Sequence, residues 1–425
     1  MEKKIYFLFI IIILFIFLYK IFIYLNKIKE KRFYAKLTKN LYKEFHEVMS
    51  SNLKGDELIS YYKFVVQKYC TEDDLNYNEK PLISVIIPIY NGEKYIITML
   101  LSIEAQSFKN IEIVYVDDNS IDNSIKLIKK LQMFDKRIKL YTNKENKGTL
   151  YTKSFGVIKA NGKYVIVLDQ DDILVNKNLF ETLIYEAENK FLDIVQFYWI
   201  DFSPESGFFS IDGNKKYPNY YKIITQPELG DTKNYLNETL YKSFYLWDKL
   251  IKKETYINAL NFLGEEIWTK KIVHREDHLV TFAIYKVAKK YMRVKTYGYC
   301  HIINSNQQSN DFHAILNGKE VAQSKRESML LDQFQYSQFL FNVTQDSEEE
   351  KSVAFREFFI IINNINFATK VKDKNLFNLV IDTFKVYLNS TFINPIRKKI
   401  ILKFCCAFCN KNIKQYYNYY KYYLF

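Results

Sequence analysis

The central part of this 425-residue chain is predicted to form an α/β domain, because two patterns alternate along it. Short runs of β-branched residues have the length of buried strands, and the segments between them repeat apolar residues with a helical period. Such alternation is typical of a mostly parallel, Rossmann-like sheet with helices on both faces. The expected strands are 82–88, 111–116, 138–141, 164–168 and 193–200, and the expected helices are 95–106, 121–133 and 150–159.

An apolar segment near the N-terminus predicts a membrane anchor within residues 1–30. Ile5 to Tyr19 is unbroken apolar sequence, Lys20 interrupts it, and Ile21 to Leu25 resumes it. A helix over Ile5–Leu25 would be about 31 Å long, which matches the hydrocarbon core of a bilayer. No small-residue cleavage site follows, so a retained single-pass anchor is favoured over a cleaved signal peptide.

The anchor implies a membrane localisation, in an endomembrane such as the Golgi or the ER if the source is eukaryotic. Lysines flank both ends of the apolar segment, so the side that carries the folded domain stays open. The rest of the chain divides into a helical stem over 31–80, the α/β domain over 81–310 and a helical region over 311–425. That last region ends in a basic, aromatic tail.

The distribution of charge argues against a nucleic-acid partner. The chain holds 61 basic and 48 acidic residues, a net charge of +13. Residues 1–40 and residues 395–425 each contribute +7, which leaves about −1 for everything between them. A nucleic-acid reader usually carries a basic patch on its folded domain. Basic ends next to apolar residues suit an anionic membrane surface better.

Polar residues follow three of the expected strands. Pro88, Tyr90 and Asn91 come at the end of the first, Asp117 and Asp118 at the end of the second, and Asp169, Asp171 and Asp172 after the fourth. In open α/β sheets, ligands bind beyond the carboxyl ends of the strands. Each acidic turn alone could simply cap a helix, but two such turns on one sheet edge suggest a shared site.

These acidic turns favour a divalent cation bound to a diphosphate. The chain contains neither GxGxxG nor GxxxxGK[ST], so no glycine-rich loop is available to cradle phosphates. Clustered carboxylates repel a diphosphate unless they hold a cation that bridges to it. Ligands that are all oxygen indicate Mg²⁺ or Mn²⁺ rather than zinc.

In order along the chain, these segments resemble the family-2 inverting glycosyltransferases, whose catalytic domain has the GT-A fold. Ile83–Asn91 resembles the family's first strand and nucleotide-contacting turn, and Ile113–Asp122 resembles its second strand. Val167–Asp172 resembles its DxD metal motif. Trp247–Lys253 is similar to the family's Trp-Asn-Lys-Leu-type segment, and Glu276–His278 to the acidic pair that carries the catalytic base.

The resemblance implies that a sugar moves, with inversion, from a nucleotide-sugar donor, a UDP-sugar by preference, to a glycan, lipid or protein acceptor. Asp118 would accept the uracil N–H with support from Asp117, and Tyr90 would lie against the base. Asp171, with Asp169 or Asp172, would hold the metal. Asp277 would take the proton from the acceptor hydroxyl.

Two features depart from the family pattern. Lys153 stands where the family often has arginine, and lysine keeps the charge but loses the bidentate fork, so its predicted contact with the donor is weakened. The chain also lacks the Gln-x-x-Arg-Trp motif and the several membrane spans of processive synthases, which favours the addition of one sugar at a time. His301 is interpreted as a structural histidine rather than a phosphate ligand.

Two other classes of protein stay open. A metal-dependent nucleotidyltransferase could use a similar sheet and acidic site, and it would release diphosphate rather than UDP. A catalytically inactive, membrane-tethered binding protein is the second alternative. It would be indicated by donor binding that does not depend on a metal.

Overall fold

The computed structural model describes residues 25, 26, 28–40, 43, 56–76, 78–211, 221–226, 228, 244–273, 276–303, 332 and 339. The predicted anchor over 5–25, apart from Leu25, lies outside these residues, as do the predicted C-terminal helices apart from residues 332 and 339. Within the described ranges, no helix combines the length and the apolar character needed to cross a bilayer.

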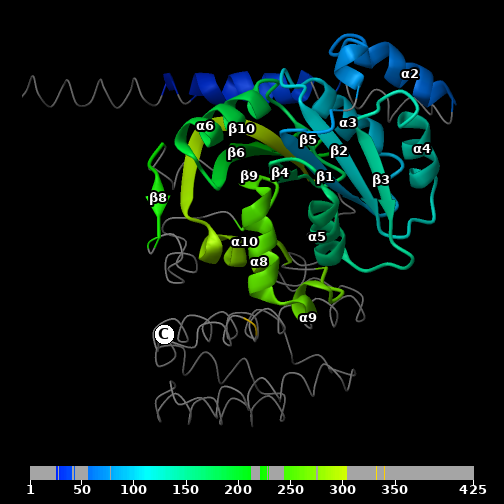
Figure 1. Cartoon of the computed structure of the whole chain (residues 1–425). Helices are drawn as coiled ribbons and strands as arrows, with labels where there is room; N and C mark the ends of the chain where they lie inside the picture. The colour runs from blue at the N-terminus through cyan, green and yellow to red at the C-terminus, as the bar shows by residue number, and fades with distance from the viewer. Residues whose placement is uncertain are drawn as a thin grey trace, which may run out of the picture.

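The first half of the sheet is parallel, as predicted (Figure 1). Its four strands lie side by side in the order β3-β2-β1-β4. They are β1 (Ile83–Ile89), β2 (Ile111–Asp117), β3 (Ile138–Thr142) and β4 (Tyr164–Val167). The helices that connect them are α3 (Ile96–Glu104), α4 (Ser124–Leu131) and α5 (Thr149–Lys159), which confirms the three predicted helices.

The second half of the sheet is mixed, which corrects the expectation of simple strand-helix alternation. The strand β9 (Lys249–Lys252) lies antiparallel between β4 and β6 (Ile194–Phe202), and β6 pairs in parallel with the long β10 (Lys290–Ile302). The sheet ends at β5 (Ile173–Leu174), and β7 (Phe209–Ser210) and β8 (Ile224–Thr225) pair at its side. The remaining helices are α6 (Leu179–Lys190), α8 (Lys253–Leu263), α9 (Glu265–Trp268) and α10 (Glu276–Val287).

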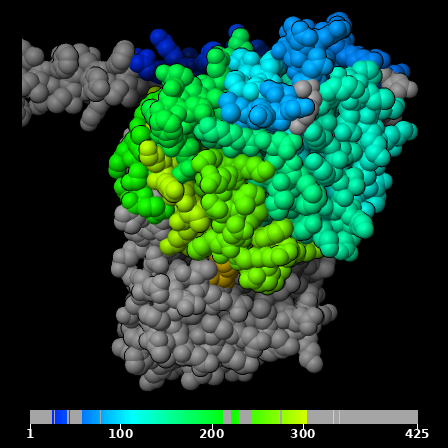
Figure 2. Space-filling model, viewed as in Figure 1, coloured from blue at the N-terminus to red at the C-terminus, as the bar shows by residue number. Residues whose placement is uncertain are grey.

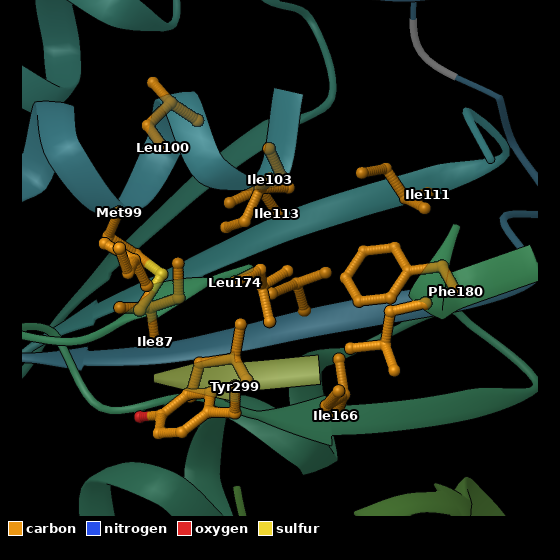
Figure 3. Close-up of a cluster of buried hydrophobic side chains, with 14 of the residues drawn as sticks. Ile87, Met99, Leu100, Ile103, Ile111, Ile113, Ile166, Leu174, Phe180 and Tyr299 are labelled. Atoms are coloured by element: carbon orange, nitrogen blue, oxygen red, sulfur yellow. The ribbon is translucent and has the colours of Figure 1, made fainter. Parts of the chain in front are cut away.

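Helices cover both faces of the sheet. In Figure 1, α3 and α6 lie on the upper side, and α5, α8 and α10 lie on the lower side. Figure 3 shows the core of the upper face, where Ile87, Met99 and Leu174 pack together from β1, α3 and β5. On the other face, Gly156 lets α5 approach β1 closely, because a Cβ at this position would lie 2.5 Å from Ile86 Cγ2. Burial on both faces explains why these strands are apolar without alternation.

The stem helices pack directly on the α/β domain. Residues 28–40 are helical, and the ring of Tyr34 lies 4.7 Å from the ring of Tyr297 in β10. Helix α2 (Asp56–Val66) buries Tyr62 and Val65. In the space-filling view of Figure 2 the blue stem residues lie against the cyan and green residues of the domain. The folded unit therefore begins well before the predicted boundary at residue 81.

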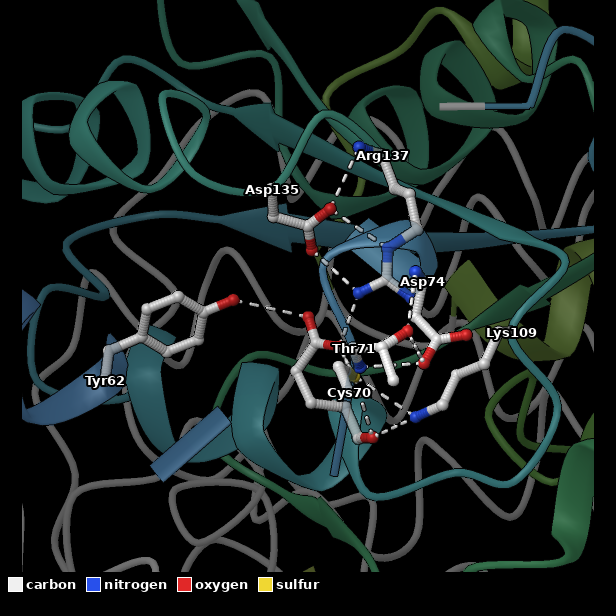
Figure 4. Close-up of polar contacts among 8 residues, drawn as sticks. Tyr62, Cys70, Thr71, Asp74, Lys109, Asp135 and Arg137 are labelled. Atoms are coloured by element: carbon white, nitrogen blue, oxygen red, sulfur yellow. Dashed lines mark hydrogen bonds and ion pairs between the residues drawn. The ribbon is translucent and has the colours of Figure 1, made fainter. Parts of the chain in front are cut away.

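A buried polar network ties α2 and the segment after it to the domain (Figure 4). Arg137 forms ion pairs with Asp135, at 2.9 Å, and with Glu104 of α3. The Glu104 carboxylate also accepts hydrogen bonds from Tyr62 Oη at 3.4 Å and from the Cys70 thiol at 3.0 Å. Burial, followed by the nearby Glu104 charge, raises the pKa of Cys70 to about 12, so the thiol keeps the proton that it donates.

Candidate active site

The three polar turns predicted at the strand ends meet and are joined to one another. The Asn91 amide donates to Ser120 Oγ at 2.9 Å, and the Asn91 side chain accepts from the Ile121 amide at 2.9 Å. The Gln170 side chain accepts from the Tyr90 amide at 3.1 Å and donates to the Tyr90 carbonyl at 3.2 Å. Asn91 adopts a left-handed backbone (φ 50°), which asparagine tolerates. Asn91 therefore fastens two turns together, while the Tyr90 ring stays 45% exposed.

Asp117 and Asp118 differ in how their acceptor atoms are used. The Asp118 carboxylate accepts hydrogen bonds from the amides of Lys147, at 2.7 Å, and Gly148, at 2.9 Å, and from Asn143 Nδ2 at 2.8 Å. It thereby holds the loop that leads into α5. Asp117 Oδ2 accepts only the Ser120 amide at 3.0 Å, and its buried Oδ1 has no hydrogen-bond partner. In this arrangement the acceptor with unused capacity belongs to Asp117.

The three aspartates of the DxD-like turn also separate. Asp172 is buried, and its two oxygens accept from Tyr299 Oη at 2.5 Å and from the Ile302 amide at 2.7 Å. Burial holds the pKa of Asp172 well above the usual value. Both oxygens of Asp172 are therefore engaged within the protein, and its predicted contact with the metal stays a prediction. Asp169 and Asp171 lie nearer the surface, and the Asp169 side chain is 33% exposed.

The described side chains supply only part of the ligand set that a hard divalent cation needs. Among the residues that the structure describes, no group of three or more histidine, cysteine, aspartate or glutamate side chains could hold a metal ion by itself. Mg²⁺ in phosphate-transfer sites is commonly bound through one or two carboxylates together with substrate phosphates. Asp169 and Asp171 could supply such a pair.

Lys153 joins the donor turn to the predicted base. This buried side chain of α5 places Nζ 2.8 Å from Asp277 Oδ1, 3.2 Å from Glu276 Oε1 and 3.1 Å from Asp169 Oδ1. Burial alone would lower the pKa of Lys153, but the three carboxylates raise it well above the usual value. Lys153 is therefore a fixed cation at the centre of the site, a role that the comparison with the family's arginine did not predict.

The acidic pair at the start of α10 lies next to Lys153 in a largely buried environment. Burial raises the pKa of Glu276 to about 8, and burial also raises the pKa of Asp277 although Lys153 opposes the shift. A general base works best when its pKa lies near the operating pH. Asp277 Oδ2 accepts the Leu246 amide at 3.1 Å, so the carboxylate is held from two sides.

His301 pairs with Asp201, with Nδ1 and Oδ1 3.1 Å apart. Burial alone would lower the pKa of His301, but the Asp201 hydrogen bond and nearby aspartates raise it to about 9. The pairing of His301 with Asp201 was not predicted from the sequence.

The comparisons with known proteins show which proteins this domain resembles. Residues 84–243 match the family model Glycosyl transferase family 2. Glycosyltransferase GlyG of Streptococcus pneumoniae serotype 4 is 34% identical over 199 residues, which are 46% of this chain and 64% of that protein. GlyA of the same bacterium is 32% identical over 221 residues, 48% of this chain and 31% of that protein. Over these ranges the chain is similar to glycosyltransferases, which supports the predicted class.

The solved structures support the fold. A crystal structure of S. aureus TarS in complex with UDP-GlcNAc aligns with a TM-score of 0.52 and 17% identity, over 79% of this chain and 89% of that one. This likeness confirms the α/β fold with a mostly parallel sheet. The chain spans less than two thirds of the length of the curated relatives named above. The family match ends at residue 243, so it does not include the predicted base at Asp277.

Proposed function

We propose that this protein transfers a sugar from a nucleotide-sugar donor, a UDP-sugar by preference, to an acceptor hydroxyl with inversion at the anomeric carbon. One observation carries the proposal: Asp277 and Asp169 both lie within 3.1 Å of the same Lys153 nitrogen. The predicted base and the predicted donor turn therefore share one centre. The UDP-GlcNAc bound to TarS, which has the same fold, supports a nucleotide-sugar donor.

Asp277 and Lys153 have separate roles in the proposed transfer. Asp277 accepts the proton of the acceptor hydroxyl while the oxygen attacks the anomeric carbon and UDP departs. A single displacement inverts the configuration and requires no nucleophile from the protein. The Lys153 cation favours the ionised form of Asp277 against the cost of burial. In this proposal its positive charge would also offset negative charge that develops on the departing diphosphate.

Nucleotide recognition is assigned to the first two turns. A buried oxygen without a hydrogen-bond donor is costly, so the uracil N–H would be bound by Asp117 Oδ1 rather than by Asp118. The exposed ring of Tyr90 would lie against the base, next to the turn formed by Pro88 and Asn91. Asp169 and Asp171 would hold Mg²⁺ or Mn²⁺, which supplies charge stabilisation to the diphosphate when bound.

The proposed activity is tested by measuring the products released from a panel of UDP-sugars. We expect UDP, and we expect its release to fall by at least about 100-fold in excess EDTA or in Asp171→Asn, because either change removes charge stabilisation from the leaving group. Asp73→Asn, an exposed acid in the stem region, is the matched control and should leave the rate unchanged. Release of diphosphate would instead identify a nucleotidyltransferase, and full activity in EDTA would exclude the metal.

We also propose that the first residues anchor the protein in a membrane, because Ile5–Leu25 is apolar and long enough to span it. Deleting residues 1–27 preserves the Tyr34 contact with Tyr297 and should move most of the protein into the soluble fraction. The basic C-terminal tail is expected to retain a salt-sensitive remainder, since attraction to a charged surface is screened by salt. A truncated protein that still requires detergent in high salt would refute the anchor.

A further inference from the structure

Aromatic side chains from β6, β10 and the segment before β9 form a continuous stack beside the candidate active site. The rings of Tyr245 and Trp247 lie 4.5 Å apart and nearly parallel, and Trp247 stacks on Tyr299 at 4.6 Å. Trp199 of β6 contacts Tyr245 and Trp247 edge-on, at 5.7 and 5.3 Å. These four residues are named the aromatic stack. Trp247 and Tyr299 are buried, whereas Tyr245 is 43% exposed, so the stack runs from the core to the surface.

The aromatic stack is bonded to both halves of the active site. The amide of Leu246, between Tyr245 and Trp247, donates to Asp277 Oδ2 at 3.1 Å. At the buried end, Tyr299 Oη donates to Asp172 at 2.5 Å and accepts the Asp169 amide at 3.2 Å. The exposed ring of Tyr245 is therefore held one residue away from the group that positions the base. An acceptor must place its hydroxyl at that base.

The chemistry of the Tyr245 ring fits a sugar. The face of an aromatic ring is electron-rich, and one face of a pyranose ring presents C–H groups whose hydrogens carry partial positive charge. Since Trp247 and Trp199 already fix the tyrosine ring, little conformational entropy is lost when a ligand stacks on it. Tyr185 of α6 is also exposed, and it lies in a helix that contributes none of the described contacts to Asp277.

We propose that Tyr245 is the outer wall of the acceptor subsite and stacks on a sugar ring of the acceptor. The inference rests on the proposed function and narrows it, because the hydroxyl that is glycosylated would belong to a carbohydrate rather than to a protein side chain. Tyr245 would act as a specificity-determining residue, and the buried members of the aromatic stack would hold it in place.

The test uses methyl β-glycosides of glucose, galactose and N-acetylglucosamine as probes, with ribitol and a serine-containing peptide as comparison ligands. Binding is followed by saturation-transfer NMR and by tryptophan fluorescence, since Trp199 and Trp247 are two of the three tryptophans. We expect at least one glycoside to bind, Tyr245→Ala to weaken it by about 3- to 10-fold, and Tyr245→Phe to restore it. Tyr185→Ala, which also removes an exposed tyrosine, should bind the glycoside like the wild type.

Donor hydrolysis without acceptor is measured on the same samples. This measurement distinguishes a failure of the proposed function from a failure of the inference about Tyr245. Wild-type protein that hydrolyses a UDP-sugar but binds none of the glycosides, or binds only ribitol or the peptide, would overturn the acceptor inference alone. Unchanged glycoside binding in Tyr245→Ala, with donor hydrolysis intact, would overturn it too. Absence of donor hydrolysis and of UDP binding in the wild type would overturn the proposed function, and with it the inference.

Discussion

Asp277→Asn is expected to lower the turnover of sugar transfer by about 10²–10⁴-fold, which is the usual contribution of a positioned general base. Asparagine has nearly the same volume, and its carbonyl oxygen can still accept one of the hydrogen bonds that Asp277 receives from Lys153 and Leu246. It cannot take the proton of the acceptor. Binding of UDP should persist, because the proposed nucleotide contacts come from the turns after β1 and β2.

The pH dependence of this variant gives a second, independent measurement. Burial raises the pKa of Asp277, so wild-type kcat/KM should fall as the pH drops below a value higher than that of an ordinary aspartate. This acid limb should be absent from the residual activity of Asp277→Asn. Glu276→Gln is the matched control at the neighbouring carboxyl group. If Asp277→Asn transfers sugar normally, Glu276 becomes the first candidate for the base; if it loses UDP binding, the proposed division between donor and base residues is wrong.

Lys153→Met is expected to destabilise the protein by about 3–5 kcal/mol at neutral pH, because it removes the cation from a buried ion-pair network. Methionine approximates the length of the lysine stem, so the loss is one of charge rather than of volume. Asp169, Glu276 and Asp277 would be left close together without a compensating charge. Free energies of unfolding from denaturant titration measure the effect, and Lys153→Arg, which retains the charge, is the control.

The sign of the pH effect distinguishes this mechanism from simple loss of packing. Without the cation, the folded-state pKa values of Glu276 and Asp277 would rise further above their unfolded values. A carboxyl group whose folded-state pKa is raised stabilises the folded state below that pKa, and the contribution is lost as the pH rises through it. The difference in stability between Lys153→Met and wild type should therefore shrink from pH 8 towards pH 5. A difference that does not change with pH would show that the effect is one of packing.

The sequence predicted those parts of the fold that local pattern determines. The strands β1, β2 and β4 are apolar and buried almost throughout, so their sequence pattern was sufficient to predict them. Strand β9 was missed because Lys249–Lys252 has only four residues, of which two are lysines, and its place is set by antiparallel pairing with β4 and β6. Such pairing between distant segments leaves no periodic signal.

In the candidate site, too, contacts between residues far apart in the sequence could not be predicted from local pattern. The acidic turns could be placed at one edge of the sheet, because strand order follows from the fold. Which aspartate is engaged depended on partners far away in sequence, such as the Ile302 amide for Asp172. Lys153 likewise meets Asp277 across 124 positions, and no spacing rule connects the two. The sequence could indicate the chemistry of the site but not its internal hydrogen bonds.

The packing of the stem has a consequence for where the enzyme could find its acceptor. If the proposed anchor ends at Leu25, Tyr34 follows only nine positions later and already contacts β10. Nine positions of helix span only about 14 Å. The folded domain would therefore lie close to the membrane surface, without a long flexible linker. Acceptors confined to the bilayer surface would then be present at a high effective concentration. A short connection of this kind would favour lipid-linked saccharides as acceptors over free glycans in bulk solution.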